Sequence, residues 1–232
     1  MRALLFVPGL LVVVAACGDD GGGADASNIP AMITISGTTT ARSTSSSMLA
    51  NVMIAAYRNG DETTPVATTT SDAQGKYALV VPTNGQPLDG FIKATLSTYM
   101  DTYLYPPFVV SADFAGASIN MLTPNTMDLL ANTLCAANQT TATGAIAVIV
   151  IDAAEMPVAG AMAASAPAAS KVCYMSGGFP SRNATVTDTD GIAYMFNVTG
   201  QATVSATKSG ATFTSHSLNA RAGAFTTTLI QP

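Results

Sequence analysis

The sequence predicts an all-β protein made of two tandem β-sandwiches, and three observations support this fold class. Most of the chain is a series of short segments in which apolar and polar residues alternate, each closed by turn residues. Threonine, serine and alanine are abundant whereas charged residues make up only 10%, a composition that suits strands and turns. The second half also repeats a turn-and-strand motif of the first half, which favours two domains over one large sandwich.

The amino terminus has the layout of a secretory signal. Met1 and Arg2 give a positive start, and residues 3–16 form an apolar run broken only by Pro8-Gly9. A membrane-spanning helix needs about 20 apolar residues, so this run is too short to cross a bilayer. We therefore predict that residues 1–16 are a signal peptide that is removed by cleavage.

The apolar run ends in Val14-Ala15-Ala16-Cys17, which resembles the bacterial lipobox, where small residues precede a cysteine. The resemblance implies cleavage before Cys17 and acylation of its thiol, for example with palmitate. Two or more acyl chains anchor a protein stably, so the implied partner of Cys17 is the lipid bilayer. The alternative is an ordinary secretory signal, with Cys17 either incidental or removed.

Residues 17–29 follow as a flexible tether, because glycine and repeated aspartate cannot bury enough apolar surface to fold. Gly18 directly after the cysteine favours the outer membrane, since inner-membrane retention in enteric bacteria uses an aspartate there. Asp19 counts somewhat against this expectation. The chain is thus expected to be exported and lipid-anchored in the cell envelope.

The charge balance argues against a nucleic-acid partner. The net charge is −5, and loss of Arg2 with the signal makes the mature chain one unit more negative. The nine basic residues are scattered, whereas polyanion binding needs clustered lysine and arginine.

The first predicted sandwich covers residues 30–123. Turn residues such as Asn59-Gly60 and Asn84-Gly85 separate its segments. Strands are expected at residues 32–36, 51–57, 65–71, 76–81, 90–97, 103–110 and 117–122.

Residues 124–143 are predicted to be a short helix and a linker. Within Thr126–Leu134 the apolar residues recur at helical spacing, and Thr126 is the expected N-cap after Pro124. The second sandwich covers residues 144–232, with strands expected at 145–151, 159–164, 171–175, 184–188, 192–197, 201–208, 212–218 and 224–230.

The two halves share a motif. Asp72 to Gly75 and Asp188 to Gly191 have the same spacing, and each leads into an aromatic-bearing strand. Together with small-residue segments such as Pro157 to Ala161, the motif resembles the carboxypeptidase regulatory-like domain, an immunoglobulin-like, transthyretin-like β-sandwich. The resemblance implies a structural, adhesive or carbohydrate-facing role and no particular activity.

Two cysteines remain once Cys17 is acylated. Cys135 and Cys173 form an even pair in an oxidising compartment, so a disulfide is the expected state. The alternative is two buried free thiols.

Two candidate chemical groups are interpreted as structural. Asp188 and Asp190 could begin a calcium loop, but residues 192–198 supply no closing carboxylate, so we interpret them as a hairpin turn and predict no metal or cofactor. His216 is the only histidine, which disfavours metal sites that need several imidazoles. A serine or cysteine nucleophile paired with His216 stays open, although no Gly-x-Ser-x-Gly frame is present.

The candidate ligand-facing group is Tyr99, Tyr103, Tyr105 and Phe108, since tyrosines on a loop can stack on sugars or peptides. The alternative, which we favour, is a strand and loop that seal one end of the first sandwich.

These observations predict a non-enzymatic, membrane-anchored envelope lipoprotein with a structural or ligand-binding role, the ligand being a carbohydrate or a protein. An accessory subunit of an envelope protein complex is the alternative. A hydrolase of unrecognised type is the least favoured interpretation.

Overall fold

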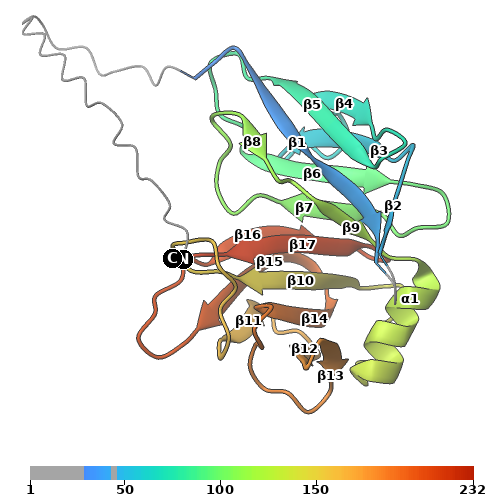
Figure 1. Cartoon of the computed structure of the whole chain (residues 1–232), viewed down its shortest axis with the longest axis vertical. Coiled ribbons are helices and arrows are strands. Elements are labelled where there is room, and N and C mark those ends of the chain that lie inside the picture. Colours follow the sequence, from blue (N-terminus) through green and yellow to red (C-terminus); the bar gives the residue numbers. More distant parts are fainter. Residues whose placement is uncertain (1–28, 43–45) are drawn as a thin grey trace, which may run out of the picture.

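The structure is a computed structural model of the 232-residue chain, and it describes residues 29–42 and 46–232. The predicted signal peptide, Cys17 and the tether up to residue 28 lie outside the described residues. Strands are the main regular structure of the described part, with one short helical segment between two groups of strands (Figure 1). This arrangement confirms the predicted fold class. No helix within the described ranges is long and apolar enough to span a bilayer.

The first half packs two sheets face to face around an apolar core. β1 lies between β5 on one side and β8 and β9 on the other, while β3, β4, β6 and β7 form the opposing layer. β5 shows the expected alternation, since Tyr77, Leu79 and Val81 are buried between exposed residues. The strands are β1 (Met32–Ala41), β2 (Ser47–Met48), β3 (Met53–Arg58), β4 (Ala67–Thr70), β5 (Lys76–Pro82), β6 (Gly90–Thr95), β7 (Thr102–Tyr105), β8 (Phe114–Ala115) and β9 (Ile119–Met121).

The second half repeats this pairing scheme. β10 pairs antiparallel with β14 and parallel with β17, as β1 does with β5 and β9. The order β11-β15-β16 in the second layer matches β3-β6-β7. The strands are β10 (Gly144–Val150), β11 (Met162–Ala166), β12 (Lys171–Ser176), β13 (Phe179–Ser181), β14 (Ile192–Val198), β15 (Gly200–Thr207), β16 (His216–Ala220) and β17 (Phe225–Ile230).

The turn that the two halves share in sequence is also the same in structure. Gly75 and Gly191 have φ values of +71° and +68°, and the amide of each donates to the carbonyl of the aspartate three residues earlier, at 2.9 Å in both cases. A Cβ atom would lie 2.6 Å from a backbone carbonyl oxygen at Gly75 and 2.5 Å from one at Gly191. Both positions therefore require glycine for its backbone conformation and for space.

A buried hydroxyl fixes the approach to each of these turns. Ser71 accepts a hydrogen bond from the amide of Val52 at 3.0 Å, and Thr187 accepts one from the amide of Ala161 at 2.9 Å. Each hydroxyl also donates to a backbone carbonyl. The Ser71 hydroxyl donates to the carbonyl of Leu49, and the Thr187 hydroxyl donates to that of Val158. The sequence repeat therefore corresponds to a structural repeat at the level of single hydrogen bonds.

The two halves are joined through a single continuous sheet. β7 pairs in parallel with β17, from Thr102 opposite Phe225 to Tyr105 opposite Thr228. The resulting nine-stranded sheet runs β13-β12-β14-β10-β17-β7-β6-β3-β4. Because side chains alternate along β7, Leu104 packs on the first core while Tyr105 packs with the second.

The helical segment begins earlier than the sequence predicted. α1 (Pro124–Asp128) is capped by Thr123, whose hydroxyl accepts from the amide of Thr126 at 3.1 Å, so the predicted cap at Thr126 was wrong. Pro124 at the first helical position, with its fixed φ, explains the earlier start. A π-helical turn, η1 (Leu129–Leu134), follows and ends at Cys135.

The helical segment covers the outer face of β10 and β14, where Leu130 and Ala131 pack among Ala147 and Phe196. The predicted disulfide is present: Cys135 and Cys173 are bonded, both are fully buried, and their Cα atoms are 5.8 Å apart. It fastens the end of the helical segment to β12.

The strand expected at residues 184–188 is not formed, and this prediction was wrong. The chain instead makes a hairpin in which β13 pairs with β12 across Gly177 and Gly178, both with positive φ. The strand expected at 212–218 is displaced to β16, His216–Ala220.

Candidate functional site

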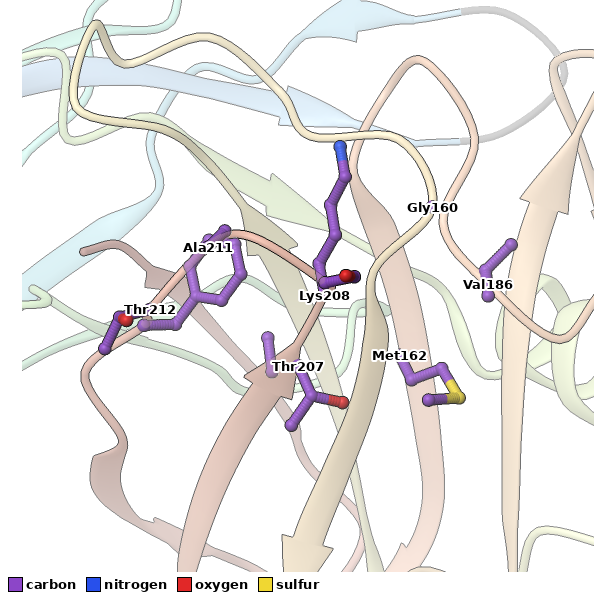
Figure 2. Close-up of a pocket in the computed structure, with 10 residues that line it drawn as sticks. Gly160, Met162, Val186, Thr207, Lys208, Ala211 and Thr212 are labelled. Atoms are coloured by element: carbon purple, nitrogen blue, oxygen red, sulfur yellow. The ribbon is translucent and has the colours of Figure 1, made fainter.

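The second half carries an open hollow of about 470 Å³ beside β11 and the loop after β15 (Figure 2). Lys208 is the charged residue of its lining and stands between Gly160 on one side and Ala211 and Thr212 on the other. Apolar lining comes from Met162, Val186 and Phe213. The hollow thus offers one cation beside an apolar wall.

The exposed edge of β11 next to this hollow is closed by side chains. The amide of Ala163 donates to the Tyr174 hydroxyl at 3.0 Å, and that hydroxyl donates to the carbonyl of Ala163 at 3.3 Å. The amide of Ala161 is engaged by Thr187. An incoming strand would have to displace these contacts, so this edge is protected against strand addition.

The four aromatic residues singled out in the sequence are placed in different surroundings. Tyr103 and Tyr105 lie in β7 and are buried, with exposed fractions of 8% and 3%. Tyr99 is half-buried against the first core. Phe108 is 45% exposed and its ring contacts Phe114 edge-on, with centroids 5.3 Å apart. The structure therefore brings two of the four together with partners from the other half.

Those two tyrosines belong to a row of rings on the face of β6 and β7 that meets the second core. Phe91 stacks on Tyr57 with centroids 5.3 Å apart and on Tyr105 with centroids 5.2 Å apart, and Tyr103 is tilted against it at 5.8 Å. Phe91, Tyr103 and Tyr105 pack in the same cluster as the core of the second half. We call these rings, with β7 and β17, the seam.

Arg221 crosses the seam from the turn between β16 and β17. Its guanidinium carbon lies 4.0 Å from the centroid of Tyr103 and 4.4 Å from that of Phe91. Its side chain is only 13% exposed. A guanidinium that lies over aromatic faces and is largely shielded from solvent makes a stabilising cation–π interaction.

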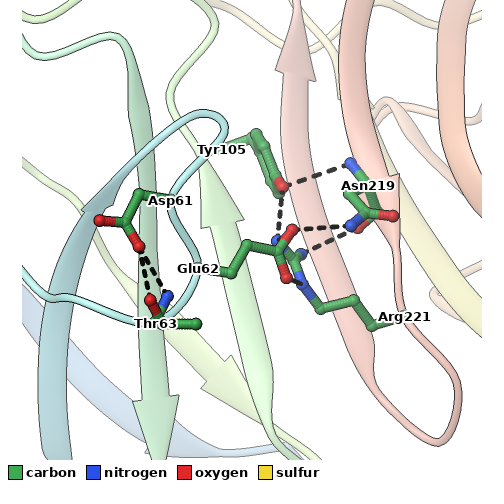
Figure 3. A network of polar contacts seen from close by, with 6 residues as sticks. All are labelled: Asp61, Glu62, Thr63, Tyr105, Asn219 and Arg221. Atoms are coloured by element: carbon green, nitrogen blue, oxygen red, sulfur yellow. Dashed lines mark hydrogen bonds and ion pairs between the residues drawn. The ribbon is translucent and has the colours of Figure 1, made fainter.

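Glu62, which lies in the loop between β3 and β4 of the first half, forms an ion pair with this guanidinium (Figure 3). The two carboxylate oxygens of Glu62 accept from Nε of Arg221 at 2.8 Å and from a terminal nitrogen at 2.6 Å. The amide side chain of Asn219 donates to Glu62 at 2.7 Å, and Arg221 also donates to the Tyr105 hydroxyl at 3.1 Å. We call Glu62, Tyr105, Asn219 and Arg221 the clasp.

The loop that presents Glu62 is held by its neighbour. The carboxylate of Asp61 accepts from the amide of Thr63 at 2.9 Å, from its hydroxyl at 2.8 Å and from the amide of Thr64 at 3.0 Å. The backbone hydrogen bond from Thr63 is the main reason why the pKa of Asp61 lies below its ordinary value. Glu62 is thus presented by a hydrogen-bonded turn.

The ionisation of the clasp favours a permanent ion pair. The hydrogen bond from Arg221 lowers the pKa of Glu62, and burial raises the pKa of Tyr105. Glu62 therefore stays negative and Tyr105 stays neutral near neutral pH. This arrangement can hold two halves together, and it presents no group poised for proton transfer.

His216 lies beside the seam and is also engaged structurally. Its Nδ1 is 2.7 Å from the hydroxyl of Thr228, and that hydroxyl donates to the carbonyl of Tyr105 at 2.9 Å. The single hydroxyl proton is thereby used, so Nδ1 of His216 is the donor to Thr228. Burial lowers the pKa of His216, with a smaller opposing effect from Asp89.

The two candidate metal-binding aspartates serve their turn. Asp188 accepts from the amides of Gly177 and Thr189, both at 2.8 Å, and Asp190 accepts from the amide of Ile192 at 3.1 Å. Among the described residues, three or more histidine, cysteine or acidic side chains do not meet in a metal-binding group. The observed contacts are those of a turn.

Three of the four clasp residues were not predicted from the sequence. Arg221, Asn219 and Glu62 carried no recognisable pattern, because each stands alone in a loop or at a strand end. Glu62 and Arg221 are 159 positions apart in the chain. Only the pairing of β7 with β17 brings them together.

Comparison with known proteins gives no family. No family model matches the chain, and no curated protein matches it. Solved structures with partial likeness include the shaft pilin SpaA of Lactobacillus rhamnosus GG, with 11% identity over 87% of this chain and 98% of that one, at a TM-score of 0.28. The minor pilin GBS52 of Streptococcus agalactiae shares 11% identity over 86% of this chain and 94% of that one, with a TM-score of 0.28.

A further structure, the Bacillus anthracis TIE protein, shares 12% identity over 86% of this chain, which spans 34% of that protein, at a TM-score of 0.27. Superpositions at these scores support no functional conclusion. The fold assignment therefore rests on the strand pairing described above.

Proposed function

We propose that the protein is an exported, lipid-anchored component of the bacterial cell envelope whose fused sandwiches have a non-catalytic, structural or ligand-binding role. The observation that carries the structural part is the seam. A continuous sheet and a partly exposed ion-pair clasp between two modules favour one rigid body over two modules on a hinge. A rigid body that projects from a membrane suits a spacer or a display platform.

A non-catalytic role is supported by the structural contacts of the side chains that could otherwise take part in catalysis. Cys135 and Cys173 are used in the disulfide, and His216 is held by Thr228 in a half-buried site. We also propose that both halves are of the carboxypeptidase regulatory-like type, because the shared turn motif comes with the same pairing order in each half.

The anchor is tested by the intact mass of the protein purified from a bacterial membrane fraction, before and after reduction. The proposal predicts a chain that begins at an acylated Cys17 and gains about two hydrogens on reduction, as expected for one disulfide. A Cys17→Ser variant should leave the membrane fraction. A soluble, unacylated mass for the parent protein would contradict the anchor.

The rigid-body part is tested by calorimetry on the mature chain. We expect one cooperative unfolding transition, with the calorimetric and van't Hoff enthalpies in agreement. Two separate transitions would show that the halves behave as independent modules and would remove the spacer role.

An accessory subunit of an envelope complex is the second candidate, and the hollow beside Lys208 favours it. Its exposed apolar wall includes Met162, which is 55% exposed. In-cell crosslinking should recover a stable partner, and Met162→Asp should abolish that product. Repeated recovery of the monomer alone would count against this role.

A further inference from the structure

Exposed apolar side chains gather at one end of the first sandwich. Met32 is 51% exposed, Val80 51%, Phe108 45% and Val109 47%. These four residues are called the tether-end patch below. Single exposed apolar residues are ordinary, but a group of four at one end of a domain marks a surface that meets another apolar phase.

Backbone contacts show that the four residues share one end. Met32 lies opposite Pro82, and Val80 lies opposite Thr34, in the β1 and β5 pair. The amide of Thr34 donates to the carboxylate of Asp113 at 2.7 Å, which brings the loop after β7 to the start of β1.

Ring contacts complete this placement. Phe114 pairs with Ile35 of β1, and its ring is in contact with Phe108. The loop that carries Phe108 and Val109 therefore lies beside the amino-terminal part of β1.

The segments that carry the patch contain no charge. Residues 30–36, 80–88 and 106–112 include no lysine, arginine, aspartate or glutamate. The acids at the border are engaged, since Asp113 accepts from Thr34 and Asp89 accepts from Asn59 at 2.7 Å. An apolar surface with charges only at its border suits the boundary between headgroups and acyl chains better than an electrostatic contact with a charged partner.

The chain from Cys17 enters the fold at this same end. The hydroxyl of Thr83 donates to the carbonyl of Pro30, and its amide donates to the carbonyl of Ala31 at 2.9 Å. Ile29 is the twelfth residue after Cys17, so covalent geometry keeps it within about 43 Å of an acylated Cys17. The opposite end, with β13, has no such constraint (Figure 1).

We propose that the tether-end patch rests on the lipid bilayer, with Phe108 and Val109 reaching the interfacial layer. This inference deepens the proposed lipid anchor and rests on it. The bilayer is then more than a tether point, because it fixes which end of the molecule faces outward.

The test uses the absence of tryptophan from the sequence, which makes an introduced tryptophan the sole reporter. Phe108→Trp places it in the patch. Phe179→Trp is the matched control, because Phe179 is 72% exposed and lies in β13 at the other end. The mature chain is coupled through Cys17, its one cysteine outside the disulfide, to maleimide lipid in phosphatidylcholine vesicles.

Vesicles with brominated acyl chains are expected to quench the tryptophan of the Phe108→Trp chain about twofold and to leave that of the Phe179→Trp chain unchanged, since interfacial residues reach about 5–10 Å into the boundary. Val109→Asp, added to the Phe108→Trp chain, should reduce the quenching at an unchanged unfolding midpoint. Equal quenching in both chains, or none in the Phe108→Trp chain, would overturn the proposal.

Chemical coupling separates this test from the test of the anchor. If the natural protein is unacylated but the coupled Phe108→Trp chain is quenched, the surface assignment stands and the anchor fails. If the natural protein is acylated and the coupled Phe108→Trp chain is not quenched, the anchor stands and the tether-end patch does not face the bilayer.

Discussion

Replacement of Arg221 by methionine removes the cation of the clasp and keeps an apolar stem of similar length. The variant loses the ion pair with Glu62, worth about 0.5–1 kcal/mol for a partly exposed pair. It loses hydrogen bonds to the Tyr105 hydroxyl and to the carbonyl of Asn219, worth about 1 kcal/mol each. It also loses the cation above the aromatic rings, worth about 1 kcal/mol.

These contributions overlap because they share one guanidinium, and methionine retains part of the packing. We therefore expect the free energy of unfolding to fall by about 2–3 kcal/mol for Arg221→Met, equal to about 5–10 °C in Tm for a protein of this size. Glu62→Gln is the matched control. It removes only the charge of the partner and should cost about 0.5–1 kcal/mol, with a smaller difference at high salt.

Denaturant unfolding, followed by circular dichroism at low and high salt, measures both variants. If Arg221→Met unfolds within about 1 kcal/mol of the parent, or no more easily than Glu62→Gln, the clasp does not stabilise the seam and the energetic reasoning above is refuted. If Arg221→Met splits one transition into two, the clasp is what makes the halves cooperate.

Three further predictions concern the second half. Thr226 is fully buried, and its hydroxyl has no hydrogen-bond partner among the described residues, so Thr226→Val should raise the free energy of unfolding by about 1 kcal/mol. Thr228 lies two positions along the same strand, and its hydroxyl is hydrogen-bonded to both His216 and Tyr105. Thr228→Val should therefore lower the free energy of unfolding by about 1–2 kcal/mol. Thermal melts of the pair check this, and equal signs would contradict it. Reduction of the Cys135–Cys173 bond opens a loop of 38 positions and should lower stability by about 4 kcal/mol, measured by urea unfolding with and without reductant; an unchanged midpoint would argue against the loop-entropy reasoning. Because the pKa of His216 is lowered in the folded state, the unfolded chain binds the imidazole proton more tightly. The free energy of unfolding should therefore fall as the pH drops below about 6.5, and this group should not affect it at higher pH. His216→Gln should make that fall less steep, and an unaltered pH profile of stability would contradict the lowered pKa of His216.

The candidate site could be predicted only in part. The sequence marked Tyr103 and Tyr105 because aromatic residues cluster there, but it could not say which face each would cover. β7 is buried on both faces in the fused sheet, so alternation along it carries no inside-outside signal. Arg221 gave no signal, because a single arginine in a turn normally faces solvent.

Local rules explain both the correct and the incorrect element predictions. The helical segment was found from its apolar spacing, yet its cap was misplaced because Thr123 and Thr126 both satisfy the capping preference and Pro124 decides between them. The strand expected at 184–188 does not form because Thr187 is hydrogen-bonded to Ala161 instead of to a neighbouring strand. Its hydroxyl accepts from the Ala161 amide and its own amide donates to the Ala161 carbonyl, which holds this segment as the start of the turn.

The all-β class and the repeated aspartate-glycine turn could be predicted from the amino-acid sequence, and the bond between Cys135 and Cys173 was the expected state of these cysteines. Each of these follows from local backbone preference or from the small number of available partners. The pairing of β7 with β17 and the contact of Glu62 with Arg221 became visible only in the folded chain. The reason is that a parallel pairing between separate modules depends on how their edges meet in space, and no spacing along the chain encodes that encounter.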